Sequence, residues 1–387
     1  MKKNVLFVVD ERRMGGVSVL LEDILNLINT SKYNIDILVL HNNGEMLENL
    51  PKSINVIYGS HYFDAIDYTI TEVIKKHNIK LLLRKIKVVM DMKLGTIEKV
   101  IKRERKKILT KNYDVEIAFK DGFTALFTIF GNSKKKVHWL HYEYKKTNPN
   151  KKYDKLFKKV LPNFDEIVAV SDNVKKYFND IYNLGDKVKV IYNIVDQEKI
   201  KIKSSEESDV VLDSNKFNIV SVGRLHPMKG YDRLIEAIYK LKEDNLLENV
   251  VFRIYGDGPL YETLKEKINN LNLNNYVFLM GKVMNPYKYI KNSDLFVLPS
   301  VYEPFGLVIV ESLTLHVPVL AAENAATSKL ICNNKTGLIV NNSTDGIYDG
   351  LKKFILNRSL VDEYKKNLEN YKYDNIELIR QIEQVLD

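Results

Sequence analysis

Short apolar runs alternate with amphipathic stretches along almost the whole chain. Apolar residues recur at three- and four-residue spacing in stretches such as Tyr231–Glu243 and Leu260–Leu271, which predicts helices there. Regular alternation of strands and helices is typical of βα units and parallel sheets. We expect strands at Asn4–Val9, Ile35–Leu40, Asn55–Gly59, Val115–Phe119, Val137–His141, Glu166–Ser171, Val188–Asn193, Phe217–Gly223, Val250–Gly256, Tyr276–Gly281, Leu295–Ser300, Pro318–Ala322 and Gly337–Val340.

The two sets of strands are separated by Lys199–Asn215, a polar, Ser-rich stretch without sustained periodicity. Such a stretch is typical of a linker. A chain of 387 residues is long enough for two domains with their own cores. We therefore predict an α/β protein with two doubly wound parallel-sheet domains, at residues 1–200 and 201–371, and a helical closing segment at Leu360–Asp387.

Composition excludes several classes of protein. A hydrophobic fraction of 45% with 10% aromatic residues excludes a disordered chain. A single cysteine, Cys332, cannot form a disulfide within the chain. No uninterrupted apolar run approaches the roughly 20 residues of a membrane-spanning helix. The apolar run after Lys2 and Lys3 ends at Asp10 and is too short for a signal peptide, so we expect a cytoplasmic protein.

Positive charge is concentrated in the first half of the chain. Residues 1–200 hold 36 Lys and Arg against 25 Asp and Glu, whereas residues 201–387 hold 23 against 25. Lys80–Lys111 alone carries twelve basic residues against three acidic ones, interleaved with apolar residues. A basic amphipathic helix favours an anionic membrane surface, and the absence of aromatics argues against single-stranded nucleic acid. A solvated basic face without a specific partner is the alternative.

Several common chemistries lack their motifs. The sequence has no G-x-x-x-x-G-K-[ST] loop, no G-x-G-x-x-G after the first strand and no Asp-x-Asp. His138 and His141 are three residues apart in an expected strand, where they would point to opposite faces, which argues against a zinc pair. These absences argue against a P-loop ATPase, a dinucleotide dehydrogenase and a metal-carboxylate site.

Two glycine-rich turns and one basic loop follow expected strands. Gly15 and Gly16 follow the first strand, where backbone N–H groups can approach an anion, although a tight turn without a ligand explains them equally well. Turn chemistry alone also explains Gly256. In Gly223–Gly230 (GRLHPMKG), Arg224 offers a fork of donors and Lys229 a point charge, which together suit a diphosphate.

The most specific segment follows the strand Leu295–Ser300. In EPFGLVIVE, Glu303 lies in the loop, Gly306 near the helix start and Glu311 about two turns into the helix. The helix N-terminus there would offer free N–H groups to phosphate. Two carboxylates at different heights could hold hydroxyls on two parts of one ligand, although a structural ion pair is the alternative for Glu311.

These motifs resemble the retaining glycosyltransferases of family 4, also called group 1. Glu303 and Glu311, with seven residues between them, resemble the family's E-x7-E signature. GRLHPMKG resembles its G-R-L-x-x-x-K-G loop. Gly15 and Gly16, together with VAVSDNVKKYF at Val168–Phe178 and VIYNIVD at Val190–Asp196, follow in the family's order. Five matching segments, each at a strand end, are highly specific.

The resemblance implies the GT-B fold, with two Rossmann-like domains facing a cleft. Residues 1–200 would bind the acceptor, residues 201–371 the nucleotide sugar, and a last helix at about 372–387 would return to the first domain. The activity implied is retaining, metal-independent transfer of a hexose from a nucleotide sugar, by default a UDP-sugar, to a lipid-linked or membrane-borne saccharide. No cofactor and no nucleic acid are expected, and the protein would be peripheral at the inner face of the cell membrane.

The resemblance also assigns roles to single residues. Arg224 and Lys229 would bind the diphosphate, Glu311 the nucleotide ribose and Glu303 the donor sugar. His141 would lie near the reacting sugar. The remaining donor contacts would come from Gly15, Gly16, Gly256, Phe305, Gly306 and Leu307.

The sequence departs from the family pattern in two places. His316 stands where the family often has a small residue, and Asn324–Thr327 replaces a usual Gly-Gly. Both departures concern the sugar pocket that the resemblance implies, and neither affects the diphosphate site. A non-catalytic partner of another glycosyltransferase and a sugar-nucleotide epimerase are the alternative functions.

Overall fold

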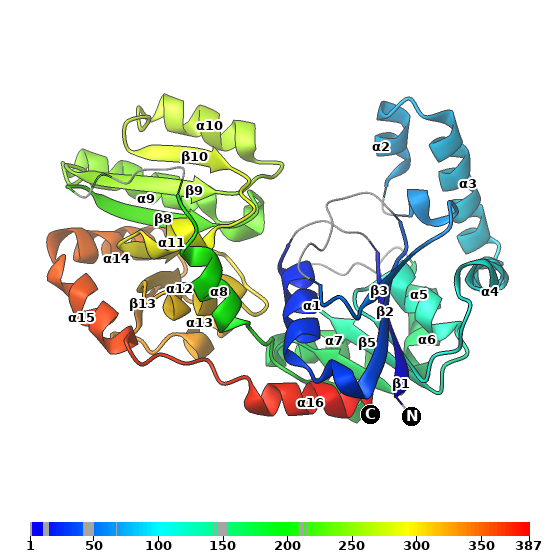
Figure 1. Cartoon of the computed structure of the whole chain (residues 1–387). Helices are drawn as coiled ribbons and strands as arrows, with labels where there is room; N and C mark the ends of the chain where they lie inside the picture. The colour runs from blue at the N-terminus through cyan, green and yellow to red at the C-terminus, as the bar shows by residue number, and fades with distance from the viewer. Residues whose placement is uncertain are drawn as a thin grey trace. The chain divides into compact units, whose positions relative to one another are not determined.

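Every apolar run that the sequence marks as a strand forms one. The computed structural model describes residues 2–10, 15–41, 50–66, 68–142, 144, 153–208, 213 and 215–387. The chain divides into two units, one of Met1–Ile194 with Asn375–Asp387 and one of Val195–Asp374 (Figure 1). Each unit is built around one parallel sheet. The predicted fold class, two doubly wound α/β domains, is confirmed.

The first unit holds a sheet of seven parallel strands in the order β3-β2-β1-β4-β5-β6-β7. Its central strands are almost entirely buried, because helices cover a parallel sheet and leave its strands no solvent face. The strands are β1 (Lys3–Val9), β2 (Tyr33–Val39), β3 (Asn55–Tyr58), β4 (Val115–Ala118), β5 (Lys135–Leu140), β6 (Glu166–Ala169) and β7 (Val188–Val190).

The second unit holds a sheet of six parallel strands in the order β10-β9-β8-β11-β12-β13. This is the strand order of a doubly wound dinucleotide-binding fold. The strands are β8 (Phe217–Val222), β9 (Val250–Tyr255), β10 (Val277–Gly281), β11 (Leu295–Leu298), β12 (Val319–Ala322) and β13 (Gly337–Val340).

Helices connect the strands in both units, as the three- and four-residue spacing predicts. Those of the first unit are α1 (Gly16–Leu27), α2 (Ile70–Lys75), α3 (Ile79–Lys93), α4 (Ile97–Ile108), α5 (Phe123–Ile129), α6 (Asp154–Val160), α7 (Asp172–Tyr182) and α16 (Ile376–Leu386). Those of the second are α8 (Gln197–Ser204), α9 (Tyr231–Glu243), α10 (Tyr261–Asn270), α11 (Tyr287–Lys291), α12 (Leu307–Thr314), α13 (Ala325–Leu330), α14 (Thr344–Leu356) and α15 (Ser359–Leu368).

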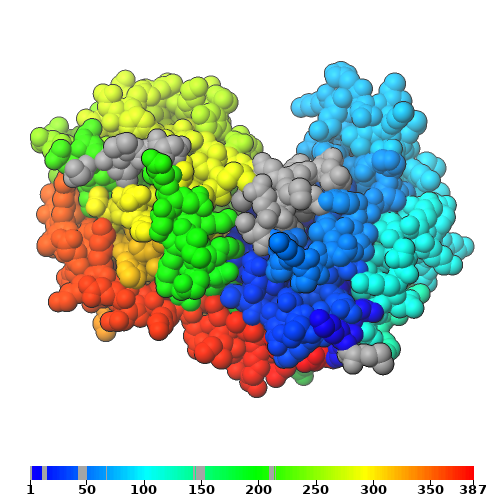
Figure 2. Space-filling view, viewed as in Figure 1, coloured from blue at the N-terminus to red at the C-terminus, as the bar shows by residue number. Residues whose placement is uncertain are grey.

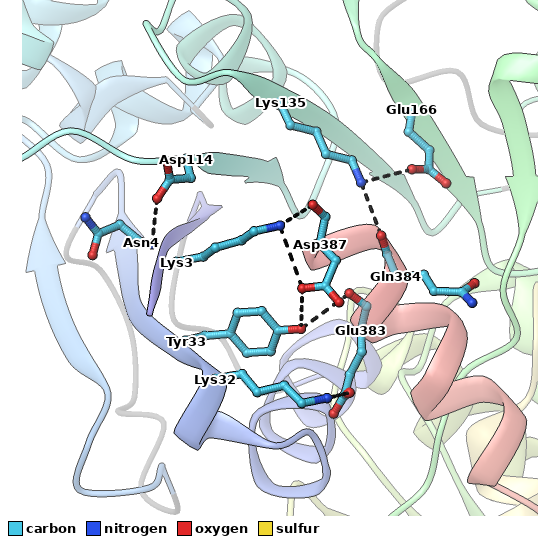
Figure 3. A network of polar contacts seen from close by, with 10 residues as sticks. All are labelled: Lys3, Asn4, Lys32, Tyr33, Asp114, Lys135, Glu166, Glu383, Gln384 and Asp387. Carbon is cyan, nitrogen blue, oxygen red and sulfur yellow. Dashed lines mark hydrogen bonds and ion pairs between the residues drawn. The ribbon is translucent and has the colours of Figure 1, made fainter. Parts of the chain in front are cut away.

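The C-terminal helix α16 packs on the first unit, beside the start of β1 and β2 (Figures 1 and 3). Its apolar residues Ile382, Val385 and Leu386 are buried in that unit's core. Polar contacts surround them. The Nζ atom of Lys32 lies 2.5 Å from Oε2 of Glu383. The chain's two ends meet through Lys3 and Asp387 and through the Tyr33 hydroxyl, which donates to Asp387 Oδ1 at 3.2 Å (Figure 3).

The prediction of an unstructured linker at Lys199–Asn215 is partly wrong. Helix α8 occupies its first part, because Asp196 accepts a hydrogen bond from the Lys199 N–H at 3.0 Å and so caps the helix, while Ile200 is buried. One buried apolar residue gives too weak a periodic signal to mark a helix in the sequence. Residues 209–212 and 214 of the expected linker lie outside the described residues.

Candidate functional site

The candidate site of the second unit lies where its sheet changes direction. Strands β8 and β11 are neighbours, but the chain proceeds from β8 to β9 on one side and from β11 to β12 on the other. Loops that leave the carboxyl ends of two such strands turn apart, and open α/β sheets bind ligands in the crevice between them. The loop after β8 carries Arg224 and Lys229, and the loop after β11 carries Glu303.

Glycines allow the loops after β8 and β9 to lie against each other. The Gly223 N–H donates to the Tyr255 carbonyl at 2.9 Å. Gly256 has a φ of 150°, and a Cβ atom there would lie 1.9 Å from the Gly223 carbonyl oxygen. A side chain at residue 256 would therefore push the two loops apart. The structure gives Gly256 this packing role, and its predicted contact with the donor stays a prediction.

A tight turn positions Lys229. The 3-10 helix Pro227–Lys229 ends at Gly230, whose φ of 67° is left-handed, and a Cβ there would lie 2.1 Å from the Pro299 carbonyl oxygen. Only glycine fits such a close approach at this dihedral angle. The main chain of Val301 donates to the Met228 carbonyl at 2.9 Å, which joins this turn to the loop after β11.

Lys229 and Glu303 form an ion pair at this point. The Lys229 Nζ atom lies 2.6 Å from Oε2 of Glu303, and the Ser300 hydroxyl donates to the same oxygen at 3.3 Å. The Lys229 side chain is 27% exposed and that of Glu303 is 9% exposed. A cation and a carboxylate thus lie in contact beyond the carboxyl ends of β8 and β11.

Arg224 completes the cationic part of the site. It directly follows Gly223 and is exposed to solvent. Its guanidinium has no partner among the residues that the structure describes. Because five N–H donors are left to solvent, this side chain can bind a phosphate without first breaking another contact.

Helix α12 begins next to Gly306, as the sequence predicts. Gly306, with a φ of 87°, is its N-cap, and the helix starts at Leu307. Glu311 therefore lies about one turn into the helix, and the predicted two turns is wrong. The reason is the spacing itself, because the residues between Gly306 and Glu311 make only about 1.4 turns at 3.6 residues per turn. The first turn contains no acidic residue and no side chain caps its N–H groups, so these donors can bind a ligand.

Glu311 is buried beside a tyrosine. It is 8% exposed, and the Tyr287 hydroxyl of α11 donates to its Oε1 atom at 3.4 Å. Of the two other predicted donor contacts near this helix, Phe305 is buried and packs edge-on to Tyr373 with ring centroids 6.4 Å apart. Leu307 is half-buried. The ring of Phe305 is therefore not open to a ligand without a rearrangement.

His141, Gly15 and Gly16 belong to the first unit. His141 follows β5 and is buried, with its ring 4.8 Å from that of Phe119. Burial is the main cause that lowers the pKa of His141 to about 3, and the Asp121 charge opposes it. The imidazole is therefore neutral at physiological pH. Its Nε2 atom has no hydrogen-bond partner within the described ranges.

Gly15 and Gly16 lie at the start of α1. Gly15 is the N-cap, in an extended conformation that any residue adopts, and no atom within 4 Å would meet a Cβ there. Neither sterics nor backbone strain in the described structure thus requires glycine at position 15. The predicted phosphate contact of both glycines stays a prediction.

The first sheet has its own change of direction, between β1 and β4. Asp10 after β1 pairs with Lys120 after β4 at 2.7 Å. Both line a cavity of about 230 Å³ whose other walls include Asp121, Tyr142 and Phe157. Tyr144 donates a hydrogen bond to Asp121, and His138 Nε2 lies 3.3 Å from the same carboxylate. Asp10 and Lys120 each directly follow an expected strand, and that position could have identified them as candidate site residues in the sequence.

Sequence reasoning also does not identify the residues that hydrogen-bond the two glutamates in the second unit. Ser300 and Tyr287 contact the two glutamates of the signature, but neither lies in a motif that sequence alone distinguishes. Tyr287 comes from α11 and reaches Glu311 on α12, so only the packing of the two helices brings them together.

Comparison with known proteins agrees with this arrangement. Residues 202–374 match the family model for glycosyl transferases group 1, and residues 14–199 match that for glycosyltransferase family 4. The two matches together cover nearly the whole chain. The protein therefore belongs to the group 1 glycosyltransferases with a GT-B fold, as the motifs indicate.

Two curated relatives have named activities. One, from Campylobacter jejuni, is an N-acetylgalactosamine-N,N'-diacetylbacillosaminyl-diphospho-undecaprenol 4-alpha-N-acetylgalactosaminyltransferase, 33% identical over 57% of this chain and 60% of its own. The other, from Escherichia coli, is a UDP-Gal:alpha-D-GlcNAc-diphosphoundecaprenol alpha-1,3-galactosyltransferase, 29% identical over 52% of this chain and 53% of its own. The chain thus matches little more than half the length of either relative.

Among solved structures, Anabaena Alr3699/HepE in complex with UDP and glucose superposes with a TM-score of 0.69. The alignment covers 99% of both chains at 17% sequence identity. At this identity the likeness shows the shared fold.

Proposed function

We propose that the protein transfers a sugar from a nucleotide-sugar donor to a lipid-linked saccharide, with retention of anomeric configuration. A UDP-sugar is the default donor. The observation that carries the proposal is the Lys229–Glu303 ion pair at the direction change of the second sheet, where Ser300 also binds Glu303. Both curated relatives are named for transfer to diphospho-undecaprenol-linked saccharides, which supports a lipid-borne acceptor. Such an enzyme would work as a peripheral protein at the inner face of the cell membrane.

The proposed roles follow from charge. Arg224 and Lys229 offset the charge that develops on the diphosphate as its bond to the sugar breaks, and the free N-terminus of α12 adds to this effect. Because these cations can supply the stabilisation, the proposal includes no metal and no cofactor. Glu303 would hold hydroxyls of the donor sugar, and Glu311 those of the ribose.

Retention would follow from attack on the face that the diphosphate leaves. The bond from the anomeric carbon to the phosphate oxygen breaks while the acceptor oxygen bonds to the same carbon. The acceptor's proton goes to the departing phosphate oxygen. A neutral His141 would act as a hydrogen-bonding group rather than as a cation, because its pKa is lowered to about 3.

The test is a transfer assay. Purified protein is incubated with UDP-, GDP- and ADP-sugars and an undecaprenyl-diphosphate-linked saccharide, and the product's anomeric configuration is read by NMR. We expect transfer from one donor with retention, and loss of transfer in Lys229→Ala but not in Lys240→Ala. Lys240 is a matched control, because it forms an ion pair with Asp345 on the surface of the same unit.

Other outcomes would favour the alternative functions. Interconversion of a nucleotide sugar without an acceptor would indicate an epimerase. Nucleotide binding without any turnover, even with the acceptor present, would indicate a non-catalytic partner subunit. Inverted product would contradict the retaining mechanism.

A further inference from the structure

One helix of the first unit exposes a row of apolar side chains. Half of the large apolar side chains that are exposed in the described part of the chain lie between Ile70 and Leu94. Helix α3 and its C-cap hold five of them, with exposed fractions between 42% and 74%: Ile79, Leu83, Ile86, Met90 and Leu94. Their spacing of three and four residues places them along a single face of the helix.

The opposite face holds α3 firmly against the rest of the first unit. Leu81 and Val88 are buried, and the buried Lys85 donates to the Ile66 carbonyl at 3.1 Å. Arg84 pairs with Asp64 at 2.5 Å. The apolar row therefore belongs to an anchored helix and is not the result of a misplaced one.

Positive charge flanks the apolar row. Lys80, Lys87 and Lys93 of α3 are exposed. Its one acidic residue, Asp91, is engaged by the Tyr62 hydroxyl at 3.0 Å and the Thr96 hydroxyl at 2.8 Å. A lysine can keep its ammonium in water while its stem lies along an apolar surface. The exposed face of α3 is thus apolar along its centre and basic at its edges.

Helix α4 shows that basic composition alone does not produce such a face. Lys80–Lys111 is one basic amphipathic stretch in the sequence, but it forms two helices that differ in what they expose. The apolar residues Ile97, Val100 and Ile101 of α4 are buried in the core. Lys99, Lys102 and Lys106 lie on its exposed side. The stretch expected to be one amphipathic helix is therefore two, and of these two only α3 exposes an apolar row.

Figures 1 and 2 show α2 and α3 standing out from the rest of the first unit. Among the helices of the described ranges, none is long and apolar enough to cross a bilayer. A helix that is apolar on one side and lysine-rimmed can instead lie in the interface, with its apolar side among the acyl chains and its cations at anionic headgroups.

We propose that α3 docks the protein on an anionic lipid bilayer by inserting the row Ile79, Leu83, Ile86, Met90 and Leu94 into the membrane interface. Lys80, Lys87 and Lys93 then contact the headgroups. This inference deepens the proposed function, in which the acceptor is lipid-borne, but the surface lies outside the donor site and is tested without any transfer reaction.

The experiment compares two sets of variants by vesicle flotation. Vesicles of phosphatidylcholine alone and of phosphatidylcholine with 30% phosphatidylglycerol are used at low and high salt. Leu83→Ser/Ile86→Ser/Met90→Ser should lower binding to the anionic vesicles about 100-fold, because each lost apolar side chain removes a several-fold contribution. The matched control, Lys99→Glu/Lys106→Glu on α4, should lower it less than threefold.

Each outcome is decisive. If the serine variants bind the anionic vesicles as tightly as wild type, or if high salt abolishes the wild-type binding completely, the attraction is purely electrostatic and insertion is refuted. If wild type does not float at all, or if light scattering shows a dimer that the serine variants lose, the row is not a membrane surface. Turnover of the lipid-linked saccharide dispersed in detergent, without a bilayer, should be unchanged in the serine variants, and its absence in wild type would refute the proposed function instead.

Discussion

Replacing Glu303 by Gln should separate sugar binding from nucleotide binding. In the structure the carboxylate of Glu303 lies 2.6 Å from the Lys229 ammonium, the same cation that we propose for the diphosphate. A free nucleoside diphosphate must share Lys229 with this carboxylate and also approach its negative charge. Glu303→Gln removes that charge and keeps the shape of the side chain, so UDP alone should bind more tightly.

The size of the effect follows from the geometry. A phosphate oxygen that contacts Nζ from the other side would lie about 6 Å from the Glu303 carboxylate, since a charged hydrogen bond spans about 3 Å. Two like charges at that separation repel by about 3 kcal/mol at an effective dielectric constant of about 20. Because Lys229 is 27% exposed, water and salt screen the repulsion. We expect about 1 kcal/mol to remain, which is about a fivefold gain in UDP affinity.

Calorimetry with UDP and a transfer assay measure the two sides of the prediction. Turnover of Glu303→Gln should fall about 100-fold, because a group aimed at the transition state is lost. Lys229→Ala should instead weaken UDP binding by about 1.5–3 kcal/mol, the value of a hydrogen bond to a charged group. In the double variant the gain from Glu303→Gln should disappear, which a double-mutant cycle detects.

A surface pair in the same unit provides the control. Asp345→Asn breaks the contact with Lys240 and should leave UDP affinity unchanged. A tenfold loss of UDP affinity in Glu303→Gln would refute the reasoning, because it would mean that Glu303 helps to bind the nucleotide rather than competing for Lys229.

Three further outcomes are expected. Glu311→Gln should weaken UDP binding about tenfold in calorimetry, because it weakens a charge-assisted contact to the ribose. Tyr287→Phe removes a 3.4 Å hydrogen bond to Glu311 but no charge, so it should change UDP affinity less than twofold. Arg105→Ala should lower the free energy of unfolding by about 3–5 kcal/mol in urea titration, because it leaves the buried Glu116 carboxylate without its cation. The Glu116 side chain is 2% exposed and lies 2.7 Å from the guanidinium. An unchanged urea midpoint would contradict this prediction. The pKa of Glu383 is lowered by its hydrogen bond to Lys32, so the stability that this carboxylate gives to α16 is full above its unfolded pKa and lost as pH falls through the folded value. The melting temperature of Glu383→Gln should therefore lie below that of wild type at pH 7 and approach it towards pH 3, and a constant difference across this range would refute the linkage.

Sequence alone determined the strands and most of the architecture. Buried parallel strands need continuous apolar runs, and such runs between glycine and polar residues mark all thirteen strands of the two sheets. The basic loop at Arg224 and Lys229 and the glutamates Glu303 and Glu311 were also identifiable, because their residue types and spacing form a family signature. These features are local, so a one-dimensional pattern contains them.

Tertiary structure decided what depends on packing between distant segments. The Lys229–Glu303 pair joins loops far apart in the chain, and only the neighbouring positions of β8 and β11 bring them together. Sequence composition treats α3 and α4 alike, since both are basic and amphipathic. Packing separates them, because the core buries the apolar side of α4 while α3 keeps an apolar row in solvent. Which face of a helix finds a partner depends on the surface beside it, and the sequence of the helix does not contain that surface.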